Sequence, residues 1–218
     1  MNSLSALTRP CLVLVTDRSM VPGRLEATVS EAVAGGVNLV QLREKALSAG
    51  ELLALGKRLR LRTQGRALLF INDRVDVALA CEADGVQLPE DGLPVAETHR
   101  LAGLALSVGR SVHNVAGAVA AAEAGADLLI AGTIYLSRSH PEGEAAGPAL
   151  ITQIRAALPR FSGLLLGIGG ITKDNAREVL AAGADGVAVI SSILGAPNVR
   201  LAAQELRTAM VSEAEAQR

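Results

Sequence analysis

Two positively charged side chains and an amide alternate along the segment QLREK at residues 41–45, directly after an apolar run. In an extended strand, side chains two residues apart point to the same face, so Gln41, Arg43 and Lys45 share a face and Leu42 points to the other. An arginine fork and a lysine ammonium on one face attract an anion such as a phosphate. The segment therefore predicts either an anion site or a set of solvated charges at a strand end.

A second polar pair follows the apolar residues 68–71, where the chain continues with Asn72 and Asp73. Mg²⁺ prefers hard oxygen ligands and often shares a carboxylate with the phosphates of a substrate, so Asp73 is a candidate ligand for this ion. Asp73 is an equally good candidate for the N-cap of a helix that begins near residue 74. Both interpretations stay open on these residues alone.

Glycines and serines follow the last two apolar runs of the chain. Gly169 and Gly170 come after residues 164–168, and Ser191 and Ser192 come after residues 186–190. Paired glycines let backbone N–H groups approach a phosphate, and a short helix after the last run directs its positive end toward the same anion. These residues predict a phosphate site, with a tight glycine turn that binds nothing as the alternative.

The elements that must position these residues follow from the apolar pattern, in which eight short apolar runs alternate with longer stretches of helical character. The predicted strands span residues 11–16, 39–43, 67–72, 85–88, 105–109, 128–132, 164–168 and 186–190. The predicted helices span residues 24–34, 49–61, 74–81, 95–101, 115–123, 148–157, 173–182 and 199–211. We expect Asn114 and Thr172 to act as N-caps.

Eight β-α units in a chain of 218 residues predict a single domain over residues 1–218, with the fold of a (β/α)8 TIM barrel. A doubly wound open sheet is the rival, but no Gly-x-Gly-x-x-Gly motif follows the first strand. A weak repeat of small residues precedes alternate strands, at residues 34–38, 82–86, 124–127 and 182–186. It fits tight connections under the floor of a barrel. The polar residues after the strands then meet at the opposite, active face.

Composition points to a small-molecule ligand. The 21 basic and 22 acidic residues give no positive field for nucleic acid or an anionic membrane surface, and aromatic residues, at 1%, are too few for a base-stacking platform. The chain lacks a signal-peptide pattern and a transmembrane run, so we expect a cytoplasmic protein. Cys11 and Cys81 are interpreted as core thiols. The oligomeric state is not determined by these features, and a homo-oligomer is compatible with them.

Taken together, these segments resemble the thiamine phosphate synthase/TenI family from residue 13 to about residue 194. The matching segments are LVTDR at 14–18, QLREK at 41–45, INDRVDVALA at 71–80, GRSVH at 109–113, GIGGI at 167–171 and AGADGVAVIS at 182–191. Their order and spacing carry the resemblance. It implies a barrel that acts on a small thiazole phosphate, and in the synthase also on a pyrimidine pyrophosphate that ionises to a carbocation.

The resemblance also implies roles for individual residues. Gln41, Arg43, Lys45 and Asn72 match positions that hold the pyrimidine and its pyrophosphate, Asp73 matches a Mg²⁺ ligand, and Ser111 matches another substrate contact. Gly170, Ile190 and Ser191 match the cradle of the thiazole phosphate. Ser137 and Ser139 stand at the threonines of a Thr-x-Thr-Lys motif and are expected to contact substrate.

Two positions depart from the synthase pattern. Gly92 stands where the synthase has a second Mg²⁺ ligand, which Asp91 or Glu90 would replace only if the loop shifts, and His140 stands at the lysine that contacts pyrophosphate. These losses favour the TenI branch, which isomerises a thiazole carboxylate phosphate by proton transfer without a metal. That branch has a catalytic histidine where this chain has Thr133.

His140 is the candidate to replace the missing histidine, because its imidazole titrates near neutral pH. His113, in contrast, is interpreted as a helix-start or packing residue. We therefore expect a TenI-like isomerase without a cofactor, in which His140, Arg43 and Lys45 act in catalysis. The alternative is a thiamine phosphate synthase that uses Mg²⁺, and the lesser alternative is a non-catalytic barrel that binds thiamine phosphate.

Overall fold

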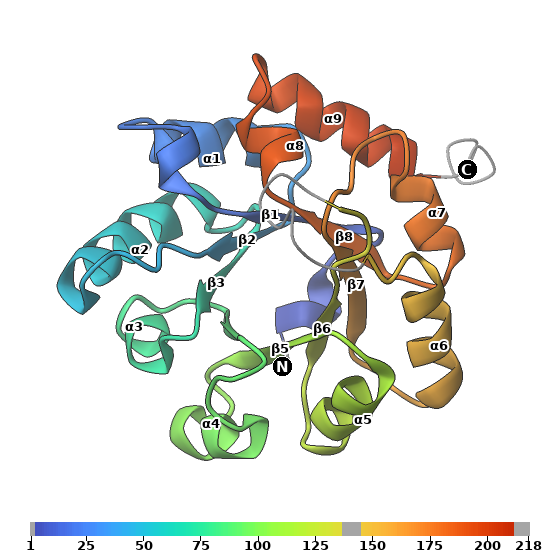
Figure 1. Cartoon of the computed structure of the whole chain (residues 1–218). Coiled ribbons are helices and arrows are strands. Elements are labelled where there is room, and N and C mark those ends of the chain that lie inside the picture. The colour runs from blue at the N-terminus through green and yellow to red at the C-terminus, as the bar shows by residue number, and fades with distance from the viewer. Residues whose placement is uncertain (1–2, 137–144, 212–218) are drawn as a thin grey trace.

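Eight parallel strands close into a barrel in the computed structural model of the chain, which describes residues 3–136 and 145–211 (Figure 1). The strands are β1 (Cys11–Val15), β2 (Leu39–Leu42), β3 (Leu68–Asn72), β4 (Gly85–Leu88), β5 (Ser107–Val112), β6 (Leu128–Ala131), β7 (Leu164–Ile168) and β8 (Gly186–Val189). Each strand pairs with the next in the chain, and β8 pairs with β1 to close the ring. The predicted (β/α)8 TIM barrel is confirmed.

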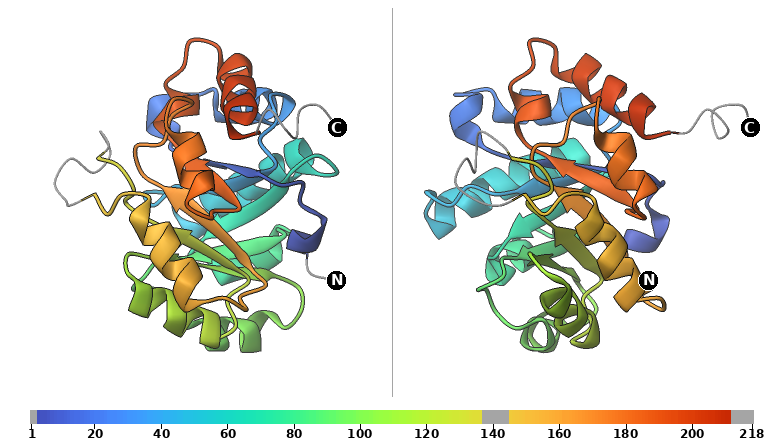
Figure 2. Two further views of the ribbon diagram at one scale, coloured as in Figure 1. Left: turned by 90° about the vertical axis from the view of Figure 1, so that its right-hand side faces the viewer. Right: turned by 45° about the vertical axis from the view of Figure 1, so that its right-hand side comes forward.

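Helices surround the barrel and follow its strands in alternation (Figures 1 and 2). They are α1 (Leu25–Ala34), α2 (Ala49–Thr63), α3 (Val75–Ala80), α4 (Val95–Ala102), α5 (Val115–Glu123), α6 (Ala149–Ala157), α7 (Ala176–Ala181), the short α8 (Ser191–Leu194) and α9 (Val199–Met210). Two 3₁₀ helices, η1 (Ser3–Ala6) and η2 (Arg18–Met20), lie before and after β1. Among the helices that the structure describes, none is long and apolar enough to cross a membrane.

One of the two predicted helix caps is correct. The Asn114 side chain accepts a hydrogen bond from the Gly117 N–H and caps α5. Thr172 does not cap α7, because that helix begins at Ala176 with Asn175 as its N-cap. The Asn175 side chain instead accepts the Thr172 N–H at 2.8 Å in a turn, and the helix begins three residues after the predicted start at residue 173.

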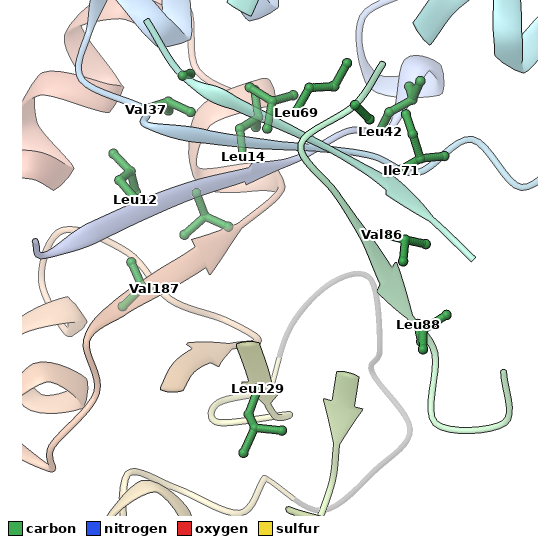
Figure 3. Packing of buried hydrophobic residues seen from close by; sticks show 14 of the residues in the cluster. Leu12, Leu14, Val37, Leu42, Leu69, Ile71, Val86, Leu88, Leu129 and Val187 are labelled. Atoms are coloured by element: carbon green, nitrogen blue, oxygen red, sulfur yellow. The ribbon is translucent and has the colours of Figure 1, made fainter. Parts of the chain in front are cut away.

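The strands bury apolar side chains on both faces, as parallel strands covered by helices must. Outward-facing side chains pack against the helices, and Figure 3 shows those of β1, β2, β3, β4, β6 and β8. A smaller cluster fills the barrel interior with side chains such as Val13, Phe70 and Leu166. Leu4 of η1 belongs to this inner cluster, and Figure 1 shows η1, in dark blue, near the barrel axis. The interior is therefore packed.

The weak sequence repeat builds the floor of the barrel. At its four occurrences an Asn or Asp side chain accepts the N–H of a residue in or next to a neighbouring strand, at 2.8 or 2.9 Å; the pairs are Asn38 with Leu12, Asp84 with Leu69, Asp127 with Val108, and Asp185 with Leu165. A residue with positive φ precedes each of them by two positions: Gly36, Glu82, Gly125 and Gly183. The repeat is thus a structural device that leaves the other end of the barrel for ligands.

Candidate functional site

A cavity of about 560 Å³ lies at the carboxyl ends of the strands. Residues of seven strands and of the segment after β4 line it, and its volume is typical of a pocket for a small molecule. The residues predicted from the sequence that line it are Gln41, Arg43, Lys45, Asn72, Ser111, Gly170, Ile190 and Ser191. The barrel therefore brings these residues to one place, while their roles in binding stay predictions.

The segment directly after β2 contributes two positive charges to the cavity, those of Arg43 and Lys45. The alternation predicted from the sequence holds, because both line the cavity together with Gln41 while Leu42 is buried on the opposite face among the outer cluster. Neither cation forms an ion pair with another side chain in the described part of the chain. Two positive charges without a carboxylate partner leave this wall suited to an anionic ligand.

Glu44 holds the β2 end against the β1 end, a role that was not predicted from the sequence. Its buried carboxylate accepts the Thr16 hydroxyl at 2.7 Å and the Arg18 N–H at 3.1 Å. The Thr16 Oγ in turn accepts the N–H of Arg43 at 3.0 Å. This network fixes the backbone from which Arg43 and Lys45 project. The signal for it was the position of Glu44 in QLREK, on the face opposite to the two cations.

Asn72 and Asp73 leave β3 in different directions. The Gln41 Nε2 donates to the Asn72 Oδ1 at 3.0 Å, and both side chains line the cavity. Asp73 is exposed, and its φ of +64° is a conformation uncommon outside glycine that is often found at functional sites. It does not cap α3, since Arg74 occupies the N-cap position without a side-chain bond. The helix-cap interpretation of Asp73 is therefore wrong.

The loop between β4 and α4 contains the departure from the synthase pattern at Gly92. A Cβ atom on Gly92 would lie 3.1 Å from the Asp73 Oδ1 and 2.8 Å from the Cδ of Pro89. The position is therefore adjacent to Asp73, but the Pro89 ring restricts any side chain placed there. Glu90 and Asp91 line the cavity from the same loop.

Arg110 of β5 fastens this loop to the barrel. Its guanidinium donates to three backbone carbonyl oxygens: Glu90 at 2.6 Å, Leu93 at 2.8 Å and Gly92 at 3.3 Å. One half-buried side chain thus determines where the loop acids stand relative to the cavity.

His113 directly precedes Asn114, the N-cap of α5, as its interpretation as a helix-start residue implies, and it also lines the cavity, which was not predicted. Its Nδ1 lies 2.5 Å from the Gly132 carbonyl oxygen, and its Nε2 lies 3.6 Å from the Glu90 Oε2. The carbonyl oxygen can only accept, so Nδ1 carries a proton and the ring orientation is fixed. When His113 is protonated it forms an ion pair with Glu90. The His113 imidazole is thus a group at the cavity wall that can donate or accept a proton.

The ends of β7 and β8 contribute backbone groups. Gly169 and Gly170 have φ of +106° and +59°, and a Cβ on Gly170 would lie 2.6 Å from the Leu136 carbonyl oxygen. Within the described residues, the N–H groups of Gly170 and Ser191 have no hydrogen-bond partner. Backbone N–H groups that line a cavity without a partner are donors for a ligand such as a phosphate.

The segment with Ser137, Ser139 and His140 lies outside the described residues, so their roles stay predictions. The chain just before it is held in place: the Tyr135 hydroxyl donates to Glu178 at 2.8 Å, and the Tyr135 N–H donates to the Gly169 carbonyl at 3.0 Å. Burial and the Glu178 carboxylate raise the pKa of Tyr135 to about 12. Tyr135 therefore keeps its proton at neutral pH and serves as a structural donor.

Among the described residues, no group of three His, Cys, Asp or Glu side chains could hold a metal ion, so Mg²⁺ at the β3 and β4 ends would depend on one or two carboxylates. This ion often takes only one or two carboxylates from a protein and completes its octahedron with water and substrate phosphate oxygens. Asp73 is exposed beside Gly92, and Asp91 lines the cavity from the same loop. Asp73 is the carboxylate that would bind the ion. Asp91 is the loop acid nearest in sequence to Gly92, where the synthase pattern has its second Mg²⁺ ligand.

Comparisons with known proteins concern the chain as a whole. A model of the thiamine monophosphate synthase family matches residues 12–193. The thiamine-phosphate synthase of Methanospirillum hungatei JF-1 is 40% identical over 205 residues, which cover 92% of this chain and 97% of that protein. A putative thiamine-phosphate synthase of Geobacter sulfurreducens is 45% identical over 198 residues, which cover 89% and 92%.

A solved structure gives the same result. Thiamine phosphate pyrophosphorylase from Pyrococcus furiosus superposes with a TM-score of 0.82 at 39% identity, covering 92% of this chain and 95% of that one. These names favour the synthase alternative over the TenI-like isomerase that we expected from the two departures. On the match over residues 12–193 and on relatives of about 40% identity along nearly their whole length, the chain belongs to the thiamine monophosphate synthase family of enzymes.

Proposed function

We propose that the chain is a thiamine-phosphate synthase, which joins a hydroxymethylpyrimidine pyrophosphate to a thiazole phosphate and releases pyrophosphate. The observation that carries this proposal is the presence of two separate sets of anion-binding groups in one cavity. Arg43 and Lys45 project from the β2 end, and the free N–H groups of Gly170 and Ser191 lie at the β7 and β8 ends. A synthase needs two such sets, because each of its substrates carries phosphate.

In the proposed reaction the carbon–oxygen bond of the pyrimidine substrate breaks, and its electron pair leaves with pyrophosphate. The thiazole nitrogen then attacks the resulting carbocation. Arg43 and Lys45 stabilise the negative charge that develops on the leaving group, which is where a fixed positive charge lowers the barrier most. Mg²⁺ bound by Asp73 and the substrate phosphates would supply further positive charge there.

The remaining cavity residues orient the reactants. The N–H groups of Gly170 and Ser191 hold the thiazole phosphate, so the thiazole nitrogen stands near the carbocation. Ile130, Ile168 and Ile190 line the cavity with apolar surface that excludes water from a cation that water would quench. In this proposal Ser137 and Ser139 contact substrate, and His140 takes the place of the pyrophosphate-binding lysine.

A TenI-like isomerase is the second candidate, and His113 is the observation that favours it. Its ring is held at Nδ1 by a backbone carbonyl and faces Glu90 through Nε2, which is an arrangement for moving a proton between substrate atoms. His140 is a second proposed proton carrier for the same reaction. Such an isomerase needs no Mg²⁺ and no pyrimidine substrate.

Mass spectrometry of reaction mixtures distinguishes the candidates. The purified chain is incubated with Mg²⁺ and both phosphorylated substrates, and separately with the thiazole carboxylate phosphate alone. Rapid formation of thiamine phosphate supports the synthase. Conversion of the thiazole to its tautomer without coupling would replace it by the isomerase, and saturable binding without any turnover would indicate a non-catalytic barrel.

A further inference from the structure

Gln87 is a buried polar side chain that the proposed reaction does not use. It extends from β4 into the barrel interior and is 1% exposed. Its Nε2 donates to the Ser111 Oγ at 3.1 Å, and within the described residues its Oε1 has no hydrogen-bond partner. Burying an amide with an unpaired oxygen costs free energy. A polar group kept at that cost often has a functional role, and the hydrogen bond to Ser111 indicates what the role is here.

Gly109 determines where the Gln87 amide lies. The two residues pair in the register of β4 and β5, and a Cβ on Gly109 would stand 2.0 Å from the Gln87 Oε1. The amide therefore lies flat across the glycine and points its nitrogen at Ser111, two residues further along β5. Any side chain at position 109 would displace it.

The bond from Gln87 fixes the polarity of Ser111. A serine hydroxyl has one proton to donate, and the amide nitrogen has no lone pair to accept it. Ser111 lines the cavity, so its proton is available to a ligand there. Asn72 has a matching arrangement, because its Oδ1 accepts from Gln41 and its Nδ2 is left to donate. This wall of the cavity thus presents donors to a ligand whose atoms accept.

We propose that Gln87 is a positioning residue that holds Ser111 as a hydrogen-bond donor to the anionic substrate. The proposal rests on the proposed function, because it requires a phosphorylated ligand in this cavity. Gln87 itself touches no ligand; it acts through Ser111 and depends on Gly109 for its own placement.

A double-mutant cycle with inorganic pyrophosphate as the probe tests this proposal. Binding is measured by calorimetry at fixed Mg²⁺ for the unchanged chain, Gln87→Met, Ser111→Ala and the double variant. We expect each single change to weaken binding by about three- to ten-fold, the range of one hydrogen bond, and the double variant to be no weaker than Ser111→Ala. Additive losses in the double variant would overturn the proposal.

Three further variants separate positioning from loss of structure. Gln87→His retains an N–H donor and should restore binding to within about two-fold of the unchanged chain. Gly109→Ala should reproduce the loss seen in Gln87→Met although it alters neither polar residue. Thr63→Val removes a buried hydroxyl from α2, and we expect it to lower the melting temperature without changing pyrophosphate binding.

The outcomes distinguish the proposal from the function on which it rests. Failure of the unchanged chain to bind pyrophosphate would overturn both. Binding that survives Gln87→Met unchanged, or that falls equally in Thr63→Val, would overturn the positioning role alone.

Discussion

At the scale of single residues, Lys45 at the cavity should differ in its effect on catalysis from a lysine on the outer surface. Lys45 lines the cavity without an ion-pair partner among the described residues, whereas Lys57 is exposed on α2. We expect Lys45→Ala to raise the KM for the pyrimidine pyrophosphate by about ten-fold or more, because a charge-assisted bond to phosphate is lost. Steady-state kinetics at fixed Mg²⁺ measures this, and Lys57→Ala is the matched control. Equal effects of the two changes would contradict the assignment.

Pro89 restricts which side chain position 92 can accept. A side chain at position 92 would stand beside Asp73 but meets the Pro89 ring, with 2.8 Å between its Cβ and the Cδ of Pro89. We expect Gly92→Asp alone to destabilise the fold by about 1 to 3 kcal/mol through overpacking. Pro89→Gly together with Gly92→Asp should relieve the contact.

The double variant should also bind a divalent ion more tightly, because two carboxylates then face the same site. Electron paramagnetic resonance of Mn²⁺, titrated with pyrophosphate present, measures this affinity, and thermal unfolding measures the stability. Mn²⁺ affinity that is the same in the unchanged chain and in the double variant would show that position 92 does not face the ion.

The sequence predicted some of the site residues better than others. Gln41, Arg43 and Lys45 were expected on one face, and all three line the cavity. This could be predicted because the alternation of side chains along extended backbone is a local property. The contacts of Glu44, Gln87 and His113 were not predicted, because their partners lie 19 to 28 residues away in the chain. Such partners become neighbours only when the barrel closes.

At the scale of elements, the loop after β4 depends on Arg110. We expect Arg110→Met to release the loop, because three carbonyl oxygens lose their donor while the aliphatic part of the side chain is kept. Hydrogen exchange followed by mass spectrometry should show faster exchange at residues 89–94, with kcat/KM lowered several-fold. Arg100→Met, on the exposed surface of α4, should change neither. Unchanged exchange in Arg110→Met would remove the fastening role.

Element boundaries show where sequence patterns stop being informative. The bounds of β4 and β7 match the prediction, since their apolar runs end sharply. β5 was predicted over residues 105–109 but runs from Ser107 to Val112, because Arg110 and Ser111 resemble a loop in isolation. Both have a tertiary reason to be in the strand, since Arg110 holds the loop after β4 and Ser111 faces the cavity.

At the scale of the whole molecule, the buried thiol of Cys11 makes the stability of the fold decrease at alkaline pH. Burial raises the pKa of the Cys11 thiol from the ordinary 9.0 to about 12, against the opposing charges of Arg207 and Arg9. The unfolded chain loses this proton near pH 9 and the folded chain near pH 12, so the folded state binds more protons in that window. Stability from Cys11 is thus fully present below pH 9 and falls as pH rises toward 12.

Urea unfolding from pH 8 to pH 11 measures this contribution. We expect the unchanged chain to lose about 1 kcal/mol more stability than Cys11→Ala between pH 8 and pH 10, because one pH unit past the unfolded pKa corresponds to about 1.4 kcal/mol. Comparing the two chains cancels the titration of all other groups. Parallel curves for the two chains would show that the thiol is not held neutral by the fold.

The most direct test of the central claim is the stoichiometry of the reaction. Phosphorus NMR follows thiazole phosphate and hydroxymethylpyrimidine pyrophosphate in one tube with the purified chain. The two-site cavity predicts that both substrates disappear together on addition of Mg²⁺, and that thiamine phosphate and pyrophosphate appear in equal amounts. Persistence of both substrates with Mg²⁺ present, at enzyme concentrations comparable to theirs, would contradict the assignment as a synthase.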